Sequence, residues 1–122
     1  MRARPTLCLL LAVLAGACAE LPQTNDPPGP PVLESTGIYQ AGVGVAVDVT
    51  CTDPDGDRVT IRFTAVSGVN RVDFDWTSFI ASDRIETFYL GLGVGDWIIT
   101  AVARDELDEL GAPGVLELNV HP

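Results

Sequence analysis

Three aspartates lie at alternate positions around a proline and a glycine in TDPDGDRV, residues 52–59. Carboxylate oxygens in such a loop can bind calcium, which takes roughly six to eight oxygen ligands. The same residues also make a good turn, because aspartate bonds the backbone ahead of it, proline presets φ and glycine adopts positive φ. An EF-hand is excluded, since that loop requires glycine at Arg58 and a bidentate glutamate at Thr64. A calcium loop and a plain turn both stay open at this point.

The segments on either side of this loop predict β-strands. Residues 44–51, GVAVDVTC, alternate with a period of two, so their valines and Cys51 share one face. Residues 58–65, RVTIRFTA, repeat the pattern with apolar side chains on every second position. Because Cys51 is in phase with the valines, it is predicted to be a buried structural thiol.

Later segments alternate in the same way, and no window has a helical period. In residues 71–76 the alternation puts Val72 and Phe74 on one face together with Trp76, although Trp76, near the end of its strand, can face either the core or the surface. About seven short strands, separated by Gly, Pro, Asn and Asp turns, predict an all-β fold with a single immunoglobulin-like antiparallel β-sandwich. The other predicted strands cover residues 86–92, 97–104 and 115–120, with a first strand around residues 32–39.

The N-terminus is predicted to be a secretory signal peptide, residues 1–17. It opens with two arginines, continues through an apolar run at residues 7–17 that is too short to span a bilayer, and ends in small residues. LAGAC, residues 14–18, resembles a bacterial lipobox, and this resemblance implies that Cys18 is lipidated. Alternatively, ordinary signal peptidase cleaves after Ala19 and releases a soluble periplasmic or extracellular protein.

The next stretch predicts a tether. Residues 18–31 contain five prolines after the cysteine, a composition that forms extended spacers rather than packed structure. In lipoproteins the residue after the cysteine directs sorting, and Ala19 is not the aspartate that favours inner-membrane retention. The resemblance therefore implies an outer-membrane anchor. The folded domain is expected to span residues 32–122.

The charge of the chain excludes two classes of partner. Seven basic side chains stand against seventeen acidic ones, giving a formal net charge of −10, and there is no lysine. A phosphate backbone is repelled by such a chain, and the arginines are scattered along the sequence. We expect no nucleic-acid partner, and membrane contact only through the lipid anchor.

Two motifs resemble a known group of domains. GDWIITAVARD, residues 95–105, is similar to the penultimate strand of PKD-type and related bacterial immunoglobulin-like domains, and residues 49–59 resemble their B strand, B–C turn and C strand. The W-x-F-G-D-G signature of the PKD subgroup is missing, so the resemblance is to the broader PKD-like or cadherin-like class. It implies binding, spacing or adhesion at the cell surface, with a protein or carbohydrate partner.

The expected topology brings a second acidic loop to the end of the sandwich where the aspartates of residues 52–59 lie. In an immunoglobulin-like sandwich the B–C and F–G loops emerge at the same end. The F–G loop here is DELDE, residues 105–109, so two acidic loops converge there. Mutual repulsion of carboxylates invites a cation, although solvated surface charge is the competing interpretation. The predicted calcium ligands are Asp53, Asp55, Asp57, Asp105 and Asp108.

No catalytic residues are predicted. The one histidine, His121, is next to the C-terminus, and no G-x-S-x-G motif occurs. Asp73 and Asp75 alternate on an outward strand face without a cleft, so a small hydrolase is the weakest alternative. If Trp76 and Phe79 are exposed together, they form a contact patch for a protein or carbohydrate. The sequence thus predicts a non-enzymatic cell-envelope lipoprotein that acts as a binding or structural module, or as a calcium-stabilised adhesion or spacer unit.

Overall fold

The computed structural model describes residues 25–122. The predicted signal peptide, Cys18 and the first part of the predicted tether lie outside these residues. The described part of the chain contains no helix that is long and apolar enough to cross a membrane. Its strands are β2 (Val32–Glu34), β3 (Tyr39–Gln40), β4 (Gly44–Thr50), β5 (Val59–Ser67), β6 (Asn70–Asp73), β7 (Ile85–Leu90), β8 (Gly95–Asp105) and β9 (Gly114–Val120).

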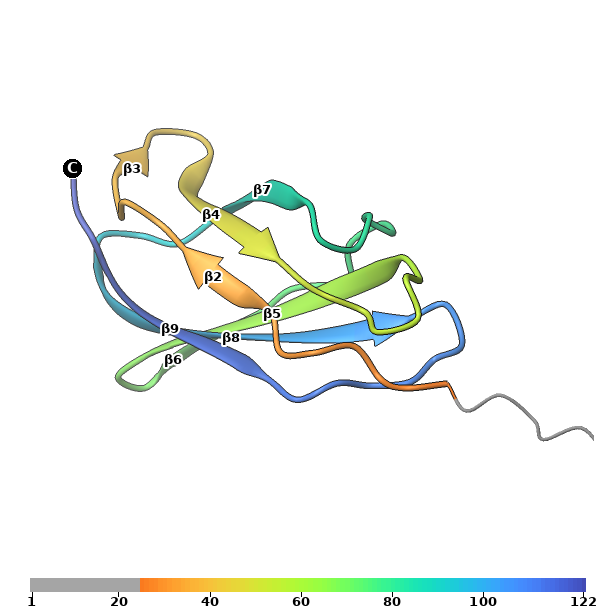
Figure 1. The fold of residues 1–122 in the computed structure, drawn as a ribbon. Coiled ribbons are helices and arrows are strands. Elements are labelled where there is room, and N and C mark those ends of the chain that lie inside the picture. Colours follow the sequence, from red (N-terminus) through yellow and green to blue (C-terminus); the bar gives the residue numbers. More distant parts are fainter. Residues whose placement is uncertain (1–24) are drawn as a thin grey trace, which may run out of the picture.

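These strands form two antiparallel sheets packed face to face, which confirms the predicted all-β, immunoglobulin-like sandwich (Figure 1). In one sheet β4 pairs with β7 on one side and with β2 and β3 on the other. The other sheet has the order β6-β5-β8-β9. The loops β4–β5 and β8–β9 lie at the end where Asn25 enters, and Pro122 lies at the opposite end (Figure 1).

The single first strand that the sequence predicts is split into β2 and β3. Between them Gly37 has a φ of 78°, and a Cβ there would overlap the carbonyl oxygen of Asn119. The chain crosses toward the other sheet at this point, where Ile38 forms a parallel bridge with His121. Only glycine fits this crossing, because it combines positive φ with close backbone contact.

The core lies between the sheets and follows the predicted alternation. Val45, Val47, Val49 and Cys51 of the β4 segment are at most 1% exposed. From the facing sheet the same holds for seven apolar side chains of β5 and β8, namely Val59, Ile61, Phe63, Ala65, Ile99, Ala101 and Ala103. Burying a valine- or leucine-sized side chain contributes about 1.5–3 kcal/mol, so this core is the main source of stability.

After β6 the predicted alternation fails at Trp76. Val72 and Phe74 pack against the core as expected. The Phe74 amide then donates to the Phe63 carbonyl at 3.1 Å, and the Thr77 amide donates to the Ile61 carbonyl at 2.9 Å. The segment from residue 74 to residue 77 is thus one residue longer than the β5 segment that it faces, residues 61–63. The extra residue makes a β-bulge, and a bulge reverses the direction in which the following side chains point. The sequence leaves open whether Trp76 faces the core or the surface, and the bulge turns it away from the core.

The proline-rich segment directly before β2 is packed, although the sequence predicts a tether up to residue 31. Pro28 and Pro31 are buried, and the Gly29 amide donates to the Thr52 carbonyl at 2.8 Å. Gly111 and Gly114 lack the space for a Cβ, which would overlap the carbonyl oxygens of Pro28 and Pro31 respectively. The packed part of the chain thus reaches back at least to Asn25. We call residues 25–31 the strap.

Candidate cation site and aromatic face

The turn between β4 and β5 is built around Asp53. Its Oδ1 atom accepts hydrogen bonds from the backbone amides of Asp55 at 2.8 Å and Asp57 at 3.3 Å. The Gly56 amide donates to the Asp53 carbonyl at 2.9 Å, and Gly56 has a φ of 75°. The turn chemistry predicted from the sequence is thus present, with glycine at the position that requires positive φ.

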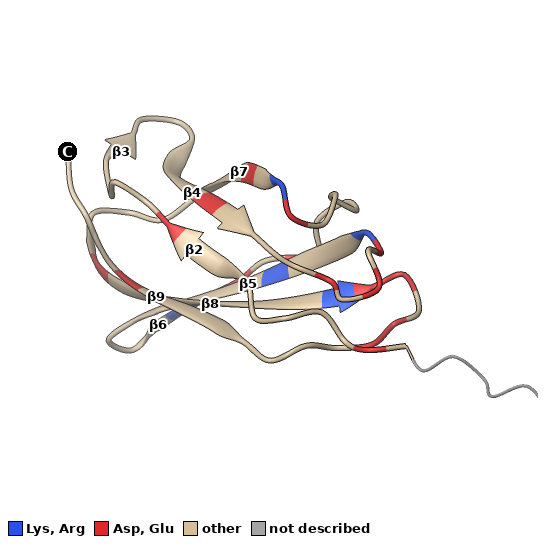
Figure 2. Ribbon diagram, in the orientation of Figure 1, with Lys and Arg blue, Asp and Glu red and all other residues tan. Residues whose placement is uncertain are grey.

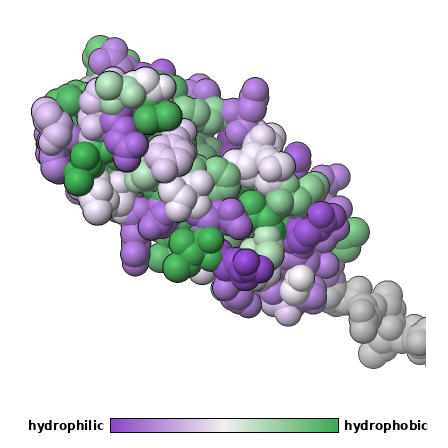
Figure 3. Space-filling view, turned by 90° about the horizontal axis from the view of Figure 1, so that it is seen from above, coloured by the Kyte–Doolittle hydropathy of each residue, from purple (hydrophilic) through white to green (hydrophobic). Residues whose placement is uncertain are grey.

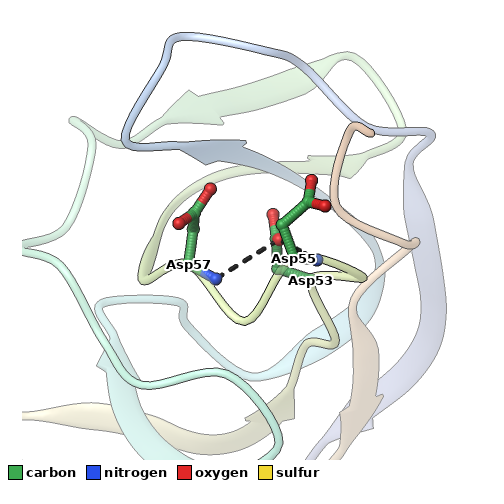
Figure 4. A group of neighbouring side chains, drawn as sticks. All are labelled: Asp53, Asp55 and Asp57. Atoms are coloured by element: carbon green, nitrogen blue, oxygen red, sulfur yellow. Dashed lines mark hydrogen bonds between the residues drawn. The ribbon is translucent and has the colours of Figure 1, made fainter. Parts of the chain in front are cut away.

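The turn uses only one oxygen of the Asp53 carboxylate. Asp53 is 3% exposed, and its Oδ2 atom has no hydrogen-bond partner among residues 25–122. One carboxylate oxygen from each of Asp53, Asp55 and Asp57 lies within 4.8 Å of the others, and Figure 4 shows Asp53 between the other two. A buried anionic oxygen without a partner is costly, so this geometry favours a cation among the three carboxylates.

The β8–β9 loop meets this turn through Asp105, which is fully buried. Its Oδ1 atom accepts from the amides of Leu107 and Glu109, each at 2.9 Å. Its Oδ2 atom accepts from the side-chain amide of Asn25 at 2.7 Å. Burial raises the pKa of Asp105, but these hydrogen bonds outweigh burial and bring the pKa below its ordinary value. Asp105 is therefore an anion that holds the loop and the strap.

The electrostatics of Asp57 show that the two loops converge. Desolvation raises the pKa of Asp57 above its ordinary value, and neighbouring negative charges add to this effect. Those charges belong to Asp53, Glu106, Asp105 and Asp55. Figure 2 shows the acidic loops at the end of the sandwich where the strap begins. We call this end the acidic pole.

Asp108, the fifth predicted ligand, has a different neighbour. Its side chain is 85% exposed, and its Oδ1 atom lies 3.7 Å from Nε of Arg104. The structure thus brings three of the predicted ligands together, places Asp105 close enough to raise the pKa of Asp57, and pairs Asp108 with an arginine.

Sequence reasoning missed three residues at the acidic pole. Asn25 bonds Asp105, and the Asp26 amide donates to Oδ2 of Asp55 at 2.8 Å. Both come from the stretch interpreted as a tether, and no local pattern relates them to the two loops. Glu106 accepts from the backbone amide of Arg58 and forms an ion pair of 3.1 Å with its guanidinium. These hydrogen bonds lower the pKa of Glu106 and raise that of Arg58.

The predicted aromatic contact residues lie one after the other beside β5. Trp76 is half-buried, and the Cζ atoms of Arg62 and Arg104 lie 5.0 and 4.3 Å from its ring centre. Phe79 is 43% exposed and has the Cζ atom of Arg58 5.3 Å from its ring centre. Each ring is thus covered in part by arginine, an arrangement that holds both ring and guanidinium in place.

Comparison with known proteins supports a non-catalytic module. No family model matches the chain, and no curated protein matches it. A solved structure, the PKD domain of an M14-like peptidase from Thermoplasmatales archaeon SCGC AB-540-F20, is similar, with 25% sequence identity and a TM-score of 0.66. The match covers 81% of this chain and all of that chain. The likeness supports the PKD-like β-sandwich and fits a structural or binding module.

Proposed function

We propose that this chain is a non-catalytic binding or spacer module of the cell envelope and that its acidic pole is stabilised by calcium. The observation that supports calcium is the buried, unpaired Oδ2 atom of Asp53, with the carboxylates of Asp55 and Asp57 on either side. A divalent cation would satisfy that oxygen and offset the repulsion that, in addition to desolvation, raises the pKa of Asp57.

Calcium fits the donor set better than the other common divalent metals. The pole offers oxygen atoms from carboxylates on loops, with no histidine or cysteine among its residues, which argues against zinc. Magnesium requires near-ideal octahedral geometry and retains several waters, whereas calcium accepts irregular oxygen sets. The ligands in this proposal are Asp53, Asp55 and Asp57. Asp105 positions Asn25 and the β8–β9 loop.

The anchor is the second part of the proposal. The lipobox-like LAGAC sequence supports diacylation of Cys18 and a tether to the outer membrane. Two acyl chains anchor a protein stably, since each buried methylene contributes about 0.8 kcal/mol. The acidic pole is then the end of the domain that is joined to the membrane, because the strap begins there (Figure 1).

Calcium binding is tested by titration calorimetry on a fragment from Pro22 to Pro122, which contains every described residue. We expect one site, and a loss of affinity of at least about tenfold in Asp53→Asn, which keeps the Oδ1 acceptor for the turn but removes the charge. Asp96→Asn is the matched control, because Asp96 lies at the start of β8, away from the acidic pole. Equal calcium binding in both variants, or none in the wild type, would exclude the site.

A second candidate function is recognition of a partner on the outer face of the β6-β5-β8-β9 sheet. The bulge after β6 favours it, because it turns Trp76 away from the core and onto that face. By contrast, the outer face of the sheet that contains β4 and β7, seen from above in Figure 3, has hydrophobic residues interspersed among hydrophilic ones. Such scattered apolar side chains are ordinary for a protein surface.

A further inference from the structure

Four of the five arginines in residues 25–122 gather on one sheet, although they are scattered along the sequence. Arg58 directly precedes β5, Arg62 lies in β5, Arg71 in β6 and Arg104 in β8. Figure 2 shows these basic residues on the sheet opposite the one that contains β4 and β7. Arginines that are far apart in the sequence are thus close together on this sheet.

This arginine-bearing face is balanced in charge rather than basic. Arg58 pairs with Glu106 at 3.1 Å, and Arg71 pairs with Asp73 at 3.1 Å. Arg62 has no ion pair among residues 25–122, and its guanidinium instead lies against Trp76. Because these arginines pair with acidic side chains, the face presents hydrogen-bond donors and acceptors to solvent without a strong positive electrostatic potential.

A hollow of about 390 Å³ lies on this face beside the bulge. Its volume falls in the range of roughly 300–1,000 Å³ that is usual for small-molecule sites. Two arginines and two aspartates line it, so their formal charges cancel. The polar side chains around it are Arg62, Thr64, Arg71, Asp73 and Asp75, and Trp76 supplies an aromatic wall.

The side chains of the hollow are held in position by one another. Arg71 Nε lies 3.1 and 3.3 Å from the two carboxylate oxygens of Asp73, and Thr64 Oγ1 is 3.3 Å from Oδ1 of Asp73. Stacking against Trp76 restrains Arg62. The guanidiniums present donors and the carboxylates present acceptors around an aromatic wall, so a ligand with both kinds of group is matched.

We propose that this hollow binds a neutral carbohydrate, one or two sugar units of a glycan. Sugar hydroxyls donate and accept hydrogen bonds at the same time. The apolar face of a sugar ring packs well against an aromatic side chain, here the part of Trp76 that lines the hollow and is not covered by Arg62 and Arg104. An anionic glycan would face Asp73, Asp75 and a chain of net charge −10. The proposal deepens the second candidate function and is independent of the calcium site.

The test is titration calorimetry of the Pro22–Pro122 fragment with three neutral oligomers, namely maltohexaose, cellohexaose and chitohexaose, and with polygalacturonate as an anionic probe. We expect at least one neutral oligomer to bind, with affinity reduced about tenfold or more by Trp76→Ala and by Asp75→Ala. Tyr89→Ala is the control, since Tyr89 is a 55% exposed aromatic side chain on the other sheet. Thermal unfolding of each variant verifies that it is folded.

Binding is expected to be unchanged in excess chelator, which separates this inference from the calcium proposal. The carbohydrate proposal is overturned if no neutral oligomer gives heat up to about 10 mM, a concentration well above a dissociation constant of about 1 mM. It is also overturned if only polygalacturonate binds. Unchanged binding of the neutral oligomers to folded Trp76→Ala and Asp75→Ala variants would overturn it as well. Loss of calcium binding with retained glycan binding would exclude the acidic pole as a metal site but leave the hollow intact.

Discussion

Asp53 uses its two carboxylate oxygens differently. Oδ1 builds the turn by accepting two backbone amides, while Oδ2 is buried without a partner in the described part of the chain. The turn and the metal loop, which compete as interpretations of the sequence, are thus compatible in the folded chain. The sequence could not decide between them, because the burial of Asp53 depends on contacts such as the bond from its amide to Oγ of Ser82.

Asp57 gives the sharpest residue-level prediction. Its folded pKa is raised, so its contribution to stability is present at low pH and is lost as the pH rises from 3.8 through the folded pKa. At pH 7 without metal, the ionised side chain is therefore destabilising. We expect Asp57→Asn to raise the unfolding midpoint in chelator and to reduce the further rise caused by calcium. A lower midpoint in chelator would contradict the proposed repulsion.

The pKa of Asp105 shifts in the opposite direction to that of Asp57. Its folded pKa is lowered, so its stabilisation is present above the ordinary value of 3.8 and is lost as the pH falls through the folded pKa. Asp105→Ala removes the charged acceptor of the Leu107 and Glu109 amides, and a hydrogen bond to a charged group contributes about 1.5–3 kcal/mol. We expect a loss of free energy of unfolding at least this large in urea titrations at pH 7.

The control for Asp105 is Asp108→Asn, because asparagine tolerates the φ of 66° at this position. The side chain of Asp108 is 85% exposed, so the change should stay within about 0.5 kcal/mol. Equal effects of the two substitutions would show that Asp105 does not organise the loop.

At the scale of elements, period-two alternation was sufficient to predict the strands of the core. The inner faces of β4, β5 and β8 follow directly from their valines, isoleucines and alanines. Alternation does not reveal where a strand changes phase, so it predicts neither the bulge before Thr77 nor the facing of Trp76. The strap was missed for a related reason: its prolines suit an extended spacer, but they pack because Gly111 and Gly114 leave room for them.

Because the strap packs against Gly114, we expect Gly114→Ala and Gly91→Ala to have different effects on stability. Gly114→Ala forces a Cβ onto the carbonyl oxygen of Pro31, and overpacking of this kind costs about 1–3 kcal/mol. Gly91→Ala meets no atom within 4 Å, so it should be neutral or stabilise by about 0.4–1 kcal/mol. Urea unfolding of both variants measures the difference. Gly114→Ala with wild-type stability would mean that the strap is not docked in solution.

At the scale of the whole molecule, acidic residues gather at one end, and two arginines pair with acidic residues of that end: Arg58 with Glu106 and Arg104 with Asp108. The acidic pole lies at the end where the strap begins, and four of the five arginines in residues 25–122 lie on the β6-β5-β8-β9 sheet (Figure 2). The net charge of −10 predicts repulsion from nucleic acid and says little about where the charges fall. Only the folded chain shows that the carboxylates of Asp53, Asp55 and Asp57 gather at one end and that the arginines of one face have acidic partners.

The anchor is tested with the full chain in a bacterial host supplied with labelled palmitate. We expect label on the wild-type chain and none on Cys18→Ser, because acylation requires the cysteine thiol. Immunoblotting of both proteins controls for expression. An unlabelled mature protein that begins at Glu20 would show ordinary signal cleavage and a soluble module instead.

The most direct test of the central claim is thermal unfolding of the Pro22–Pro122 fragment at pH 7 in calcium, in magnesium at equal ionic strength, and in excess chelator. Calcium at a hundred times its dissociation constant adds about 2.7 kcal/mol, which raises the midpoint by on the order of 10 °C for a domain of this size. We predict that shift in calcium and not in magnesium. Coincident curves in all three conditions would show that the three aspartates form a turn and nothing more.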